Sequence, residues 1–423
     1  MDTFALLDQI VYSFRGLFGS QNFALFSAYV WGVILCVGRH TVSGIYQAER
    51  PQARYWSLVK FLGRGRWEIE KVASHLIRLV LSYVSDRVYV YDQTHTIKTG
   101  KKQFGLHFFH NHRYRKGNTN QSKFHWGHQF AGLGVLTITA SAVYLFPVWV
   151  KLLAPEALAA SGFCAFTSIV RMLPAGLIIF DRGFNNKKYF RYLLENGHHL
   201  LCRARKNAAF YYPAVPPRRP RRGRKKTYGK RICIKKWRYG GLSIKPLGKT
   251  VSVAHRIVLT KICPRPVRLV VVRTKPQKSK SYRYFLVYTT DLTLSVETII
   301  YYYKLRWGFE TGIRDSKESF GFDHYQVRSQ QAIERSVFLS FLSASLVQLV
   351  ALPNFQKTHS QTLPSLNKGL RELNIHWYHP KHWTKGLIVC YIRWKKGQQL
   401  FSASSSSEQT QTKKKIPYSV AAD

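Results

Sequence analysis

The chain has 423 residues and carries 66 lysine and arginine residues against 20 acidic ones, which gives a formal net charge of +46. Its composition, 45% hydrophobic and 14% aromatic, excludes an intrinsically disordered basic tail, and the length suffices for two or three domains. The excess of positive charge predicts a polyanionic partner: nucleic acid is the first expectation and an anionic membrane surface the second.

The cysteines and the N-terminus both indicate an intracellular protein. Six cysteines are scattered without a C-x-x-C pair, so they form neither a disulfide framework nor a zinc signature, and we interpret them as reduced core residues. The N-terminus lacks the basic segment and the cleavage site of a signal peptide. The apolar stretch from Phe23 to Val37 is shorter than the roughly 20 residues of a membrane-spanning helix, so we expect a buried helix and no membrane.

Residues 1–85 are predicted to form a helical N-terminal domain. Within this range, Ile69, Val72 and Leu76 recur at helical spacing. The segments 40–47 and 56–67 have the short helix, turn and short helix of a small DNA-binding module, and a plain helical bundle explains them equally well. Basic residues of the second segment are candidates either for phosphate contacts or for solvated charges, namely Lys60, Arg64 and Arg66.

An alternating α/β pattern follows in residues 86–206. We expect strands at 87–94, 107–115 and 127–146, a helix at 154–172, a strand at 175–181, a helix at 186–197 and a strand at 198–205. This order predicts an α/β fold with a ribonuclease-H-like mixed sheet flanked by helices. Functional groups of α/β sheets gather at the carboxyl ends of strands, and Asp92 and Asp181 both lie at such ends.

Residues 207–281 are predicted to form a basic, β-rich insertion. The insertion begins with a run rich in proline, glycine and basic residues, at 216–241, and short β-like segments follow it. The basic run is either a solvated loop or a DNA clamp, and the interleaved Tyr228 and Trp237 favour the clamp. The candidate DNA contacts in this run are Arg221, Arg222, Lys225 and Lys226.

Residues 282–355 should complete the core with two helices. The first, at 294–318, begins at the N-cap candidate Ser295, and an apolar helix at 336–350 should pack beneath it. On an uninterrupted helix, four polar side chains fall within an arc of about 60° along about 21 Å of axis. They are Tyr303, Arg306, Glu310 and Lys317. Residues 356–423 are expected to form a C-terminal region with a disordered tail at 402–416.

Two interpretations of this helix follow from spacing alone. Leu305, Phe309 and Ile313 line a separate apolar face that can dock on the sheet. In the first interpretation, the Glu310 carboxylate binds a metal while Arg306 and Lys317 bind phosphates. In the second, the segment is a surface helix with ion pairs from Glu310 to Arg306 and Arg314. The two further acids at strand ends favour the first interpretation.

The stripe also carries a family resemblance. Its four residues fit the pattern Y-x2-R-x3-E-x6-K, which resembles the YREK signature of DDE transposases of bacterial insertion sequences. The DRGF segment at 181–184 is similar to the region around that family's second aspartate, and Asp92 with Thr94 resembles the first. The resemblance covers about 90–330, including the position of the β-rich insertion. Many members have a second acid after the first aspartate, and this chain has Gln93 there.

The resemblance implies a DNA transposase. Such an enzyme would bind the terminal inverted repeats of its element, cleave them, and transfer the 3′ ends into target DNA by metal-assisted phosphoryl transfer. Asp92, Asp181 and Glu310 would be the catalytic ligands of two Mg²⁺ ions, with Mn²⁺ as a substitute. Tyr303, Arg306 and Lys317 would contact phosphates near the cut. The resemblance also implies a homodimer that bridges two element ends and a cytoplasmic, nucleoid-associated location.

Several alternatives remain open at this stage. A nuclease of the same fold without strand transfer, or an inactive DNA-binding descendant, would carry the same motifs. Trp307 could stack on an extruded base, although a core tryptophan is the favoured interpretation, and Asp181 could instead cap the following helix. Five neighbouring histidines suggest zinc only weakly, and hydrogen-bonded or DNA-facing roles are the default for His107, His110, His112, His125 and His128. Asp315 and Glu318 are expected to balance Arg314 and neighbouring lysines.

Overall fold

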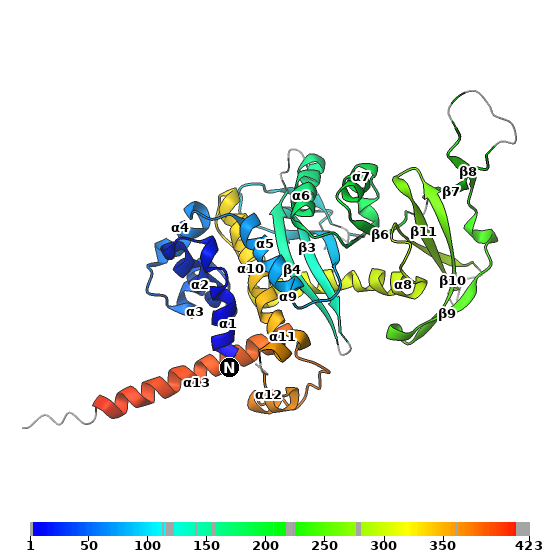
Figure 1. Cartoon of the computed structure of the whole chain (residues 1–423). Helices are drawn as coiled ribbons and strands as arrows, with labels where there is room; N and C mark the ends of the chain where they lie inside the picture. The colour runs from blue at the N-terminus through cyan, green and yellow to red at the C-terminus, as the bar shows by residue number, and fades with distance from the viewer. Residues whose placement is uncertain are drawn as a thin grey trace, which may run out of the picture.

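The computed structural model describes most of the chain. The described residues are 3–111, 114–115, 122–139, 142–153, 155, 158–205, 207–216, 223, 225–275, 281–359 and 363–411, with side chains except at 158–159 and beyond 399. The N-terminal helices lie at one end of the molecule, the central sheet lies in the middle, and the strands of the insertion lie at the other end (Figure 1).

Helices fill the N-terminal region, as the periodicity predicts. They are α1 (Thr3–Tyr12), α2 (Ser20–Leu35), α3 (Val42–Glu49), α4 (Tyr55–Arg64) and α5 (Ile69–Leu81), with a short 3-10 helix η1 (Arg15–Leu17) after α1. The apolar stretch 23–37 lies largely in α2, whose second half is buried. Lys60, Arg64 and Arg66 are exposed, so they are available to solvent or to a ligand.

Helix α10 (Gln330–Val350) joins these helices to the sheet. It lies between the N-terminal helices and strand β4 (Figure 1). Its buried Arg335 donates to the carbonyls of Phe61, Leu62 and Trp67. Among the described residues, α10 is the one helix long and apolar enough to cross a membrane, and its apolar window is wholly buried in the structure. It is therefore the central core helix of both regions.

The central sheet has the expected mixed order. Its strands are β1 (Val88–Ile97), β2 (His107–His110), β3 (Phe124–Ile138), β4 (Val143–Leu152), β5 (Leu177–Phe180) and β6 (His199–Arg203). Strand β3 pairs antiparallel with β1, β2 and β4, while β1, β5 and β6 run parallel. Helices α6 (Leu158–Met172) and α7 (Lys187–Glu195), with the 3-10 helix η3 (Arg182–Phe184), make the crossovers. This order is compatible with a ribonuclease-H-like fold.

Residues 127–146 form a hairpin, so the prediction of a single strand there was wrong. Strands β3 and β4 meet where Thr139 N–H donates to the carbonyl of Ala142 at 2.9 Å, and Ala142 N–H donates to the Thr139 hydroxyl at 3.0 Å. A threonine side chain that accepts from the backbone stabilises such a reversal. The run of small residues at 139–142 was the available signal. The 107–115 strand is also shorter than expected, because β2 ends at His110.

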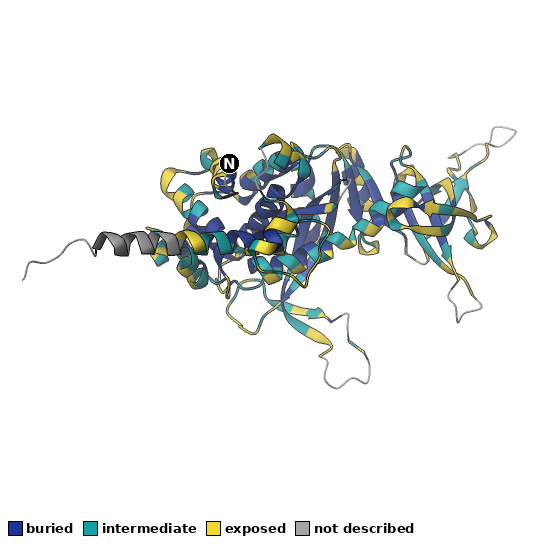
Figure 2. Ribbon diagram, turned by 90° about the horizontal axis from the view of Figure 1, so that it is seen from below, coloured by how far each residue is buried: buried dark blue, intermediate teal, exposed yellow. Residues whose placement is uncertain are grey.

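The insertion continues the central sheet. Its strands are β7 (Phe210–Pro213), β8 (Tyr228–Arg231), β9 (Gly240–Ile244), β10 (Lys249–Thr260) and β11 (Cys263–Thr274), with 3-10 helices η4 (Ile234–Lys236) and η5 (Lys245–Leu247), and β12 (Arg283–Thr289) follows it. Strand β12 pairs antiparallel with both β6 and β11, so the described strands make one twelve-stranded sheet. Figure 2 shows that the insertion is more exposed than the central sheet.

The helix expected at 294–318 is divided at Arg306. Helix α8 (Val296–Leu305) begins at Ser295, whose hydroxyl accepts from Thr298 N–H at 3.0 Å, as predicted. Helix α9 (Trp307–Phe320) follows directly. The break is marked by a tight bond from Phe309 N–H to the Arg306 carbonyl at 2.9 Å, one residue shorter than the helical spacing. Gly308, a poor helix former, lies in this turn.

The C-terminal part is helical further than expected. Helices α11 (Pro353–Thr358), α12 (Leu366–Glu372) and α13 (Lys385–Gln411) follow α10. The disorder predicted for 402–416 is therefore wrong up to Gln411, and the rest lies outside the described residues. A helix that has already formed adds each further residue at little cost, which explains how α13 extends through a serine-rich segment.

The cysteines divide into two groups of three, and all are free thiols. Cys36, Cys202 and Cys263 are buried, as expected of core residues. The other three are exposed, so the interpretation as core residues was wrong for Cys164, Cys233 and Cys390.

Candidate functional site

Two of the three acids lie side by side where the parallel pairing of β1 and β5 ends. The register pairs Tyr91 with Phe180; Asp181 follows at the end of β5, but Asp92 lies within β1, which continues to Ile97, so the prediction that Asp92 ends its strand was wrong. Neighbouring strands are about 4.8 Å apart, so the two side chains start close together. Asp181 precedes the 3-10 helix η3 without a side-chain capping bond, and Asn186 caps α7 instead. The alternative that Asp181 is a helix cap was therefore wrong.

The junction of α8 and α9 brings the third acid to this place. The Arg306 guanidinium donates from Nη1 to Asp92 Oδ2 at 2.5 Å and from Nη2 to Glu310 Oε1 at 3.0 Å. The Tyr303 hydroxyl donates to Asp181 Oδ1 at 3.1 Å. Tyr303 and Arg306, three positions apart in the chain, thus contact both aspartates. The Arg306–Glu310 pair of the surface-helix interpretation exists, but Arg306 also bridges to Asp92, so the segment is more than a solvated face.

Two glycines of β3 let α9 approach the sheet. A Cβ at Gly132 would lie 3.0 Å from Cζ of Phe309, and a Cβ at Gly134 would lie 3.1 Å from Cδ2 of the same ring. Phe309 is 1% exposed and fills the space that the glycines leave. Phe309 and Ile313 are buried, which confirms the apolar face expected for this helix, whereas Leu305 is half-buried. This packing fixes the position of Glu310.

A cleft of about 1210 Å³ opens over the acids. Asp92, Asp181, Glu310, Arg306 and Lys317 all line it. On the other side it is lined by β2 and the start of β3, where Phe109 stacks on His95 with ring centroids 4.5 Å apart. The cleft is large enough for a segment of a polymer backbone.

Burial controls the ionisation of Asp92. It raises the pKa of Asp92 to about 6, although Arg306 and the backbone N–H of Gln93 lower it; Asp181 and Glu310 raise it further. That N–H donates to Asp92 Oδ1 at 2.8 Å. The pKa of Asp92 thus responds to the charges of both other acids. Burial also raises the pKa of Tyr303, with opposing effects from Arg306 and Asp181, so its hydroxyl stays a hydrogen-bond donor.

The acids suit a hard divalent cation. Carboxylate oxygens are the ligands that Mg²⁺ and Mn²⁺ prefer. Among the described residues, no group of three or more histidine, cysteine or acidic side chains lies close enough together to hold a metal ion. The Arg306 guanidinium instead bonds to both Asp92 and Glu310. The donor set fits the metal chemistry, and the arginine provides the positive charge in this state of the protein.

Two family models match successive parts of the chain. A family model described as "Transposase DDE domain" matches residues 161–346, and a second, described as "DDE superfamily endonuclease", matches residues 14–160. These matches support a DDE-superfamily transposase. No curated protein matches the chain. The first match contains Asp181 and Glu310, and the second contains Asp92. The YREK subgroup stays an expectation.

The expected DNA-contacting residues differ in their exposure and in their partners. Lys317 is half-buried and donates to the His95 carbonyl of β1 at 2.8 Å. Tyr303 is 7% exposed and Arg306 bonds to carboxylates, so both contact the acids in this structure. Trp307 is 61% exposed at the edge of the cleft, so the favoured interpretation as a core tryptophan was wrong.

The insertion contributes exposed charge away from these acids. Lys225 and Lys226 are exposed, and Arg221 and Arg222 lie outside the described residues. Trp237 is 9% exposed beneath Arg256, so its indole packs inside the insertion and is not available to stack on a base. Tyr228 is half-buried against Tyr211, with ring centroids 5.4 Å apart.

His128 and Asp315 have structural partners. His128 is fully buried; its Nδ1 bonds to the Tyr325 hydroxyl at 2.7 Å and its Nε2 to the Phe104 carbonyl at 2.8 Å. These bonds agree with the hydrogen-bonded role expected by default and not with a zinc ligand. His112 lies outside the described residues. Asp315 pairs with Lys385 of α13 at 3.4 Å, and not with Arg314 as expected.

Sequence reasoning missed how the acids are held. Nothing in the spacing showed that Tyr303 and Arg306 would contact Asp181 and Asp92, because these bonds join residues more than a hundred positions apart. The backbone N–H of Gln93 was also missed. The expected polar stripe was the available signal, since it placed a phenol and a guanidinium on the same face as Glu310.

Proposed function

We propose that this chain is a transposase of the YREK group that binds the terminal inverted repeats of its own element, cleaves them, and joins the 3′ ends to target DNA. The observation that carries the proposal is the meeting of Asp92, Asp181 and Glu310 at one cleft through Tyr303 and Arg306. The net charge of +46 supports DNA as the substrate.

The three acids would be the ligands of two Mg²⁺ ions, for which Mn²⁺ could substitute. When bound, the ions would supply Lewis-acid stabilisation of the charge on the scissile phosphate and would activate the attacking water or DNA 3′-hydroxyl. Asp92 is kept in place by Gln93 N–H, and Asp181 by the Tyr303 hydroxyl. Gln93 stands where many relatives have an acid, yet its backbone N–H still orients Asp92, so we expect an active enzyme.

The cationic groups of the cleft would hold the DNA. Arg306 is 12% exposed and can exchange its carboxylate partners for a phosphate, because a guanidinium binds both groups through the same planar fork. Lys317 lines the same wall. The exposed indole of Trp307 would stack on an unpaired base beside the cut. Lys225 and Lys226, with Arg221 and Arg222, would contact the duplex further away.

The same proposal gives the assembly and the location. A homodimer would bridge the two ends of the element, and each active site would act on one end. The protein would act in the cytoplasm, on the nucleoid, where both the element and its targets lie.

A strand-transfer assay tests the proposal. Precleaved duplexes carrying the repeats that flank the gene would be incubated with a supercoiled target plasmid and MgCl₂. We expect joined products with wild-type protein and a loss of about 10²–10³-fold or more with Asp181→Asn, as for loss of a central electrostatic group. Asp315→Asn is the matched control, since this acid pairs with Lys385 outside the lining of the cleft.

The alternatives give different results when uncleaved duplexes with the same repeats replace the precleaved ones. Cleavage of the ends without joining would indicate a nuclease of the same fold. DNA binding without cleavage by wild-type protein would indicate an inactive descendant. Inverted repeats with short direct duplications in the DNA that flanks the gene would support the transposase independently.

A further inference from the structure

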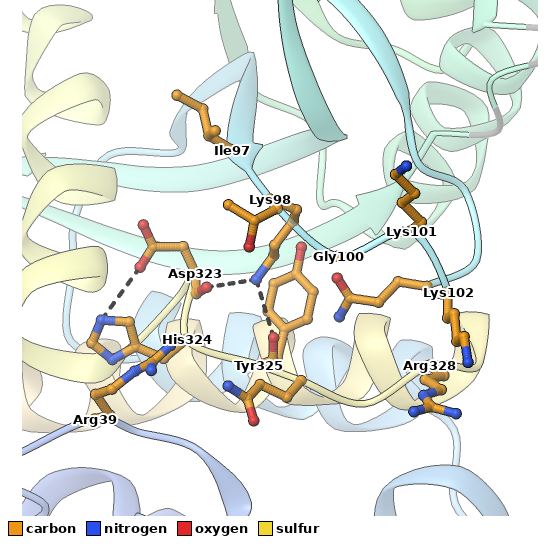
Figure 3. Close-up of a pocket in the computed structure, with 13 residues that line it drawn as sticks. Arg39, Ile97, Lys98, Gly100, Lys101, Lys102, Asp323, His324, Tyr325 and Arg328 are labelled. Carbon is orange, nitrogen blue, oxygen red and sulfur yellow. Dashed lines mark hydrogen bonds and ion pairs between the residues drawn. The ribbon is translucent and has the colours of Figure 1, made fainter.

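A second cavity lies beside the cleft and is lined by basic side chains. Its volume is about 640 Å³. Three segments that are distant in the sequence form it: Arg39 from the link between α2 and α3, residues 97–103 after β1, and residues 323–328 between α9 and α10. Figure 3 shows Lys98, Lys101, Lys102 and Arg328 around it, with Arg39 below. The N-terminal helices and the catalytic core both contribute to this cavity.

Lys98 holds two of these segments together. Its Nζ donates to the carbonyls of Asp323 at 2.6 Å and Tyr325 at 3.0 Å, and lies 3.5 Å from the centroid of the Tyr325 ring (Figure 3). Burial lowers the pKa of Lys98 to about 8, although Asp323 raises it, so the ammonium stays charged near pH 7. Gln103 Nε2 also donates to the Val327 carbonyl at 2.9 Å. These hydrogen bonds hold the segment 97–103 of the cavity against the segment 323–328.

The charge in the cavity is unbalanced. Arg39, Lys101, Lys102 and Arg328 are exposed, and among the described residues none of them forms an ion pair within 4.0 Å of a carboxylate. The one acid of the lining is Asp323, whose Oδ1 lies 3.8 Å from His324 Nε2. Several cations around one concave surface attract an anion, and guanidinium and ammonium groups suit phosphate.

The cavity continues the cleft along one strand. Ile97 and Asp323 line both, and β1 leads from Asp92 to Lys98 over six residues. At about 3.3 Å per residue this is roughly 20 Å, the axial length of about six base pairs of duplex DNA. A duplex whose cut lies over Asp92 can therefore reach the basic cavity without bending.

We propose that this cavity binds backbone phosphates of the DNA duplex about six base pairs from the cut, and so sets the direction of the duplex across the cleft. The inference rests on the proposed function, because it takes DNA as the substrate. It adds a phosphate site to which the N-terminal helices contribute Arg39. Such a site would fix the position of the duplex without reading its sequence.

The salt dependence of DNA binding tests the proposal. Binding of a fluorescein-labelled duplex would be measured by anisotropy between roughly 50 and 200 mM NaCl. Two double variants remove charge from different segments: Lys101→Ala with Lys102→Ala, and Arg39→Ala with Arg328→Ala. Each should weaken binding and make the slope of log K against log[salt] less negative by about 1.8, which is 0.9 for each lost phosphate contact. The control is Lys357→Ala with Lys368→Ala, two exposed lysines on α11 and α12.

The outcomes separate this inference from the function it rests on. Slopes that change in both cavity variants but not in the control support it. Wild-type binding with a steep slope, unchanged in both cavity variants, overturns the inference and leaves the proposed function intact. Inorganic phosphate binding that wild type shows and both cavity variants lose, with unchanged duplex slopes, would assign the cavity to a free anion and overturn the inference. Failure of wild-type protein to bind DNA overturns both.

Discussion

Gly321→Ala should destabilise the protein more than a glycine replacement usually does. Gly321 ends α9 in the left-handed region, at φ 65°, where a Cβ costs about 1–2 kcal/mol. A Cβ there would also lie 2.0 Å from His40 Cβ and 2.5 Å from His40 Cγ, which forces local repacking at about 1–3 kcal/mol. The expected loss in free energy of unfolding is therefore about 2–5 kcal/mol. This contact anchors the helix that carries Glu310 and Lys317 to the N-terminal helices.

Urea denaturation of matched variants separates the two costs. Gly248 also has a positive φ, 57°, but a Cβ there meets nothing within 4 Å, so Gly248→Ala should lose only about 1–2 kcal/mol. His40→Gly removes the clashing atoms, so in that background the loss in free energy of unfolding caused by Gly321→Ala should fall to the value for Gly248→Ala. If Gly321→Ala costs no more than Gly248→Ala in the wild-type background, the close approach of α9 to His40 is refuted.

Three other perturbations follow from the site and the core. Burial lowers the pKa of His128 to about 4, so between about pH 6.5 and pH 4 the unfolded chain binds a proton that the folded chain does not. Acidification through this window should therefore lower the free energy of unfolding by up to about 3 kcal/mol. His128→Gln should flatten that part of a curve of unfolding free energy against pH. Arg306→Gln should lower the free energy of unfolding, measured without metal by chemical denaturation, by about 1–3 kcal/mol. The loss comes mainly from Asp92, which loses a buried partner, because Glu310 is 41% exposed. An unchanged free energy of unfolding would contradict the ion pairs of Arg306 with the two acids. Trp307→Ala should change the free energy of unfolding by no more than about 0.5 kcal/mol, because the indole is exposed. It should weaken the binding of single-stranded DNA by about 5- to 150-fold in a titration. Equal affinities of the variant and the wild type would rule out stacking on a base.

The central strands and the two aspartates could be predicted because their signals are local. A short run of β-branched and aromatic residues precedes both Asp92 and Asp181, and the parallel pairing places the two side by side, although β1 continues beyond Asp92 to Ile97. The sequence also predicted the shared helical face of four polar residues, Tyr303, Arg306, Glu310 and Lys317, although the helix is divided at Arg306.

The rest depends on contacts between distant residues. Trp307 looked like a core residue because an apolar indole usually is, yet its place at the start of α9 exposes it. The bonds of Arg306 to Asp92 and of Asp315 to Lys385 join segments whose proximity no spacing rule gives. The basic cavity likewise combines three separate loops.

Counting bound Mn²⁺ by electron paramagnetic resonance tests the central claim most directly. Intact wild-type protein should bind Mn²⁺ in the cleft, and Asp92→Asn, Asp181→Asn and Glu310→Gln should each weaken that binding by at least about tenfold, or 1.4 kcal/mol. Asp315→Asn should bind as wild type does. Identical Mn²⁺ binding in the wild type and all three cleft variants would contradict the claim that these acids form one divalent-cation site.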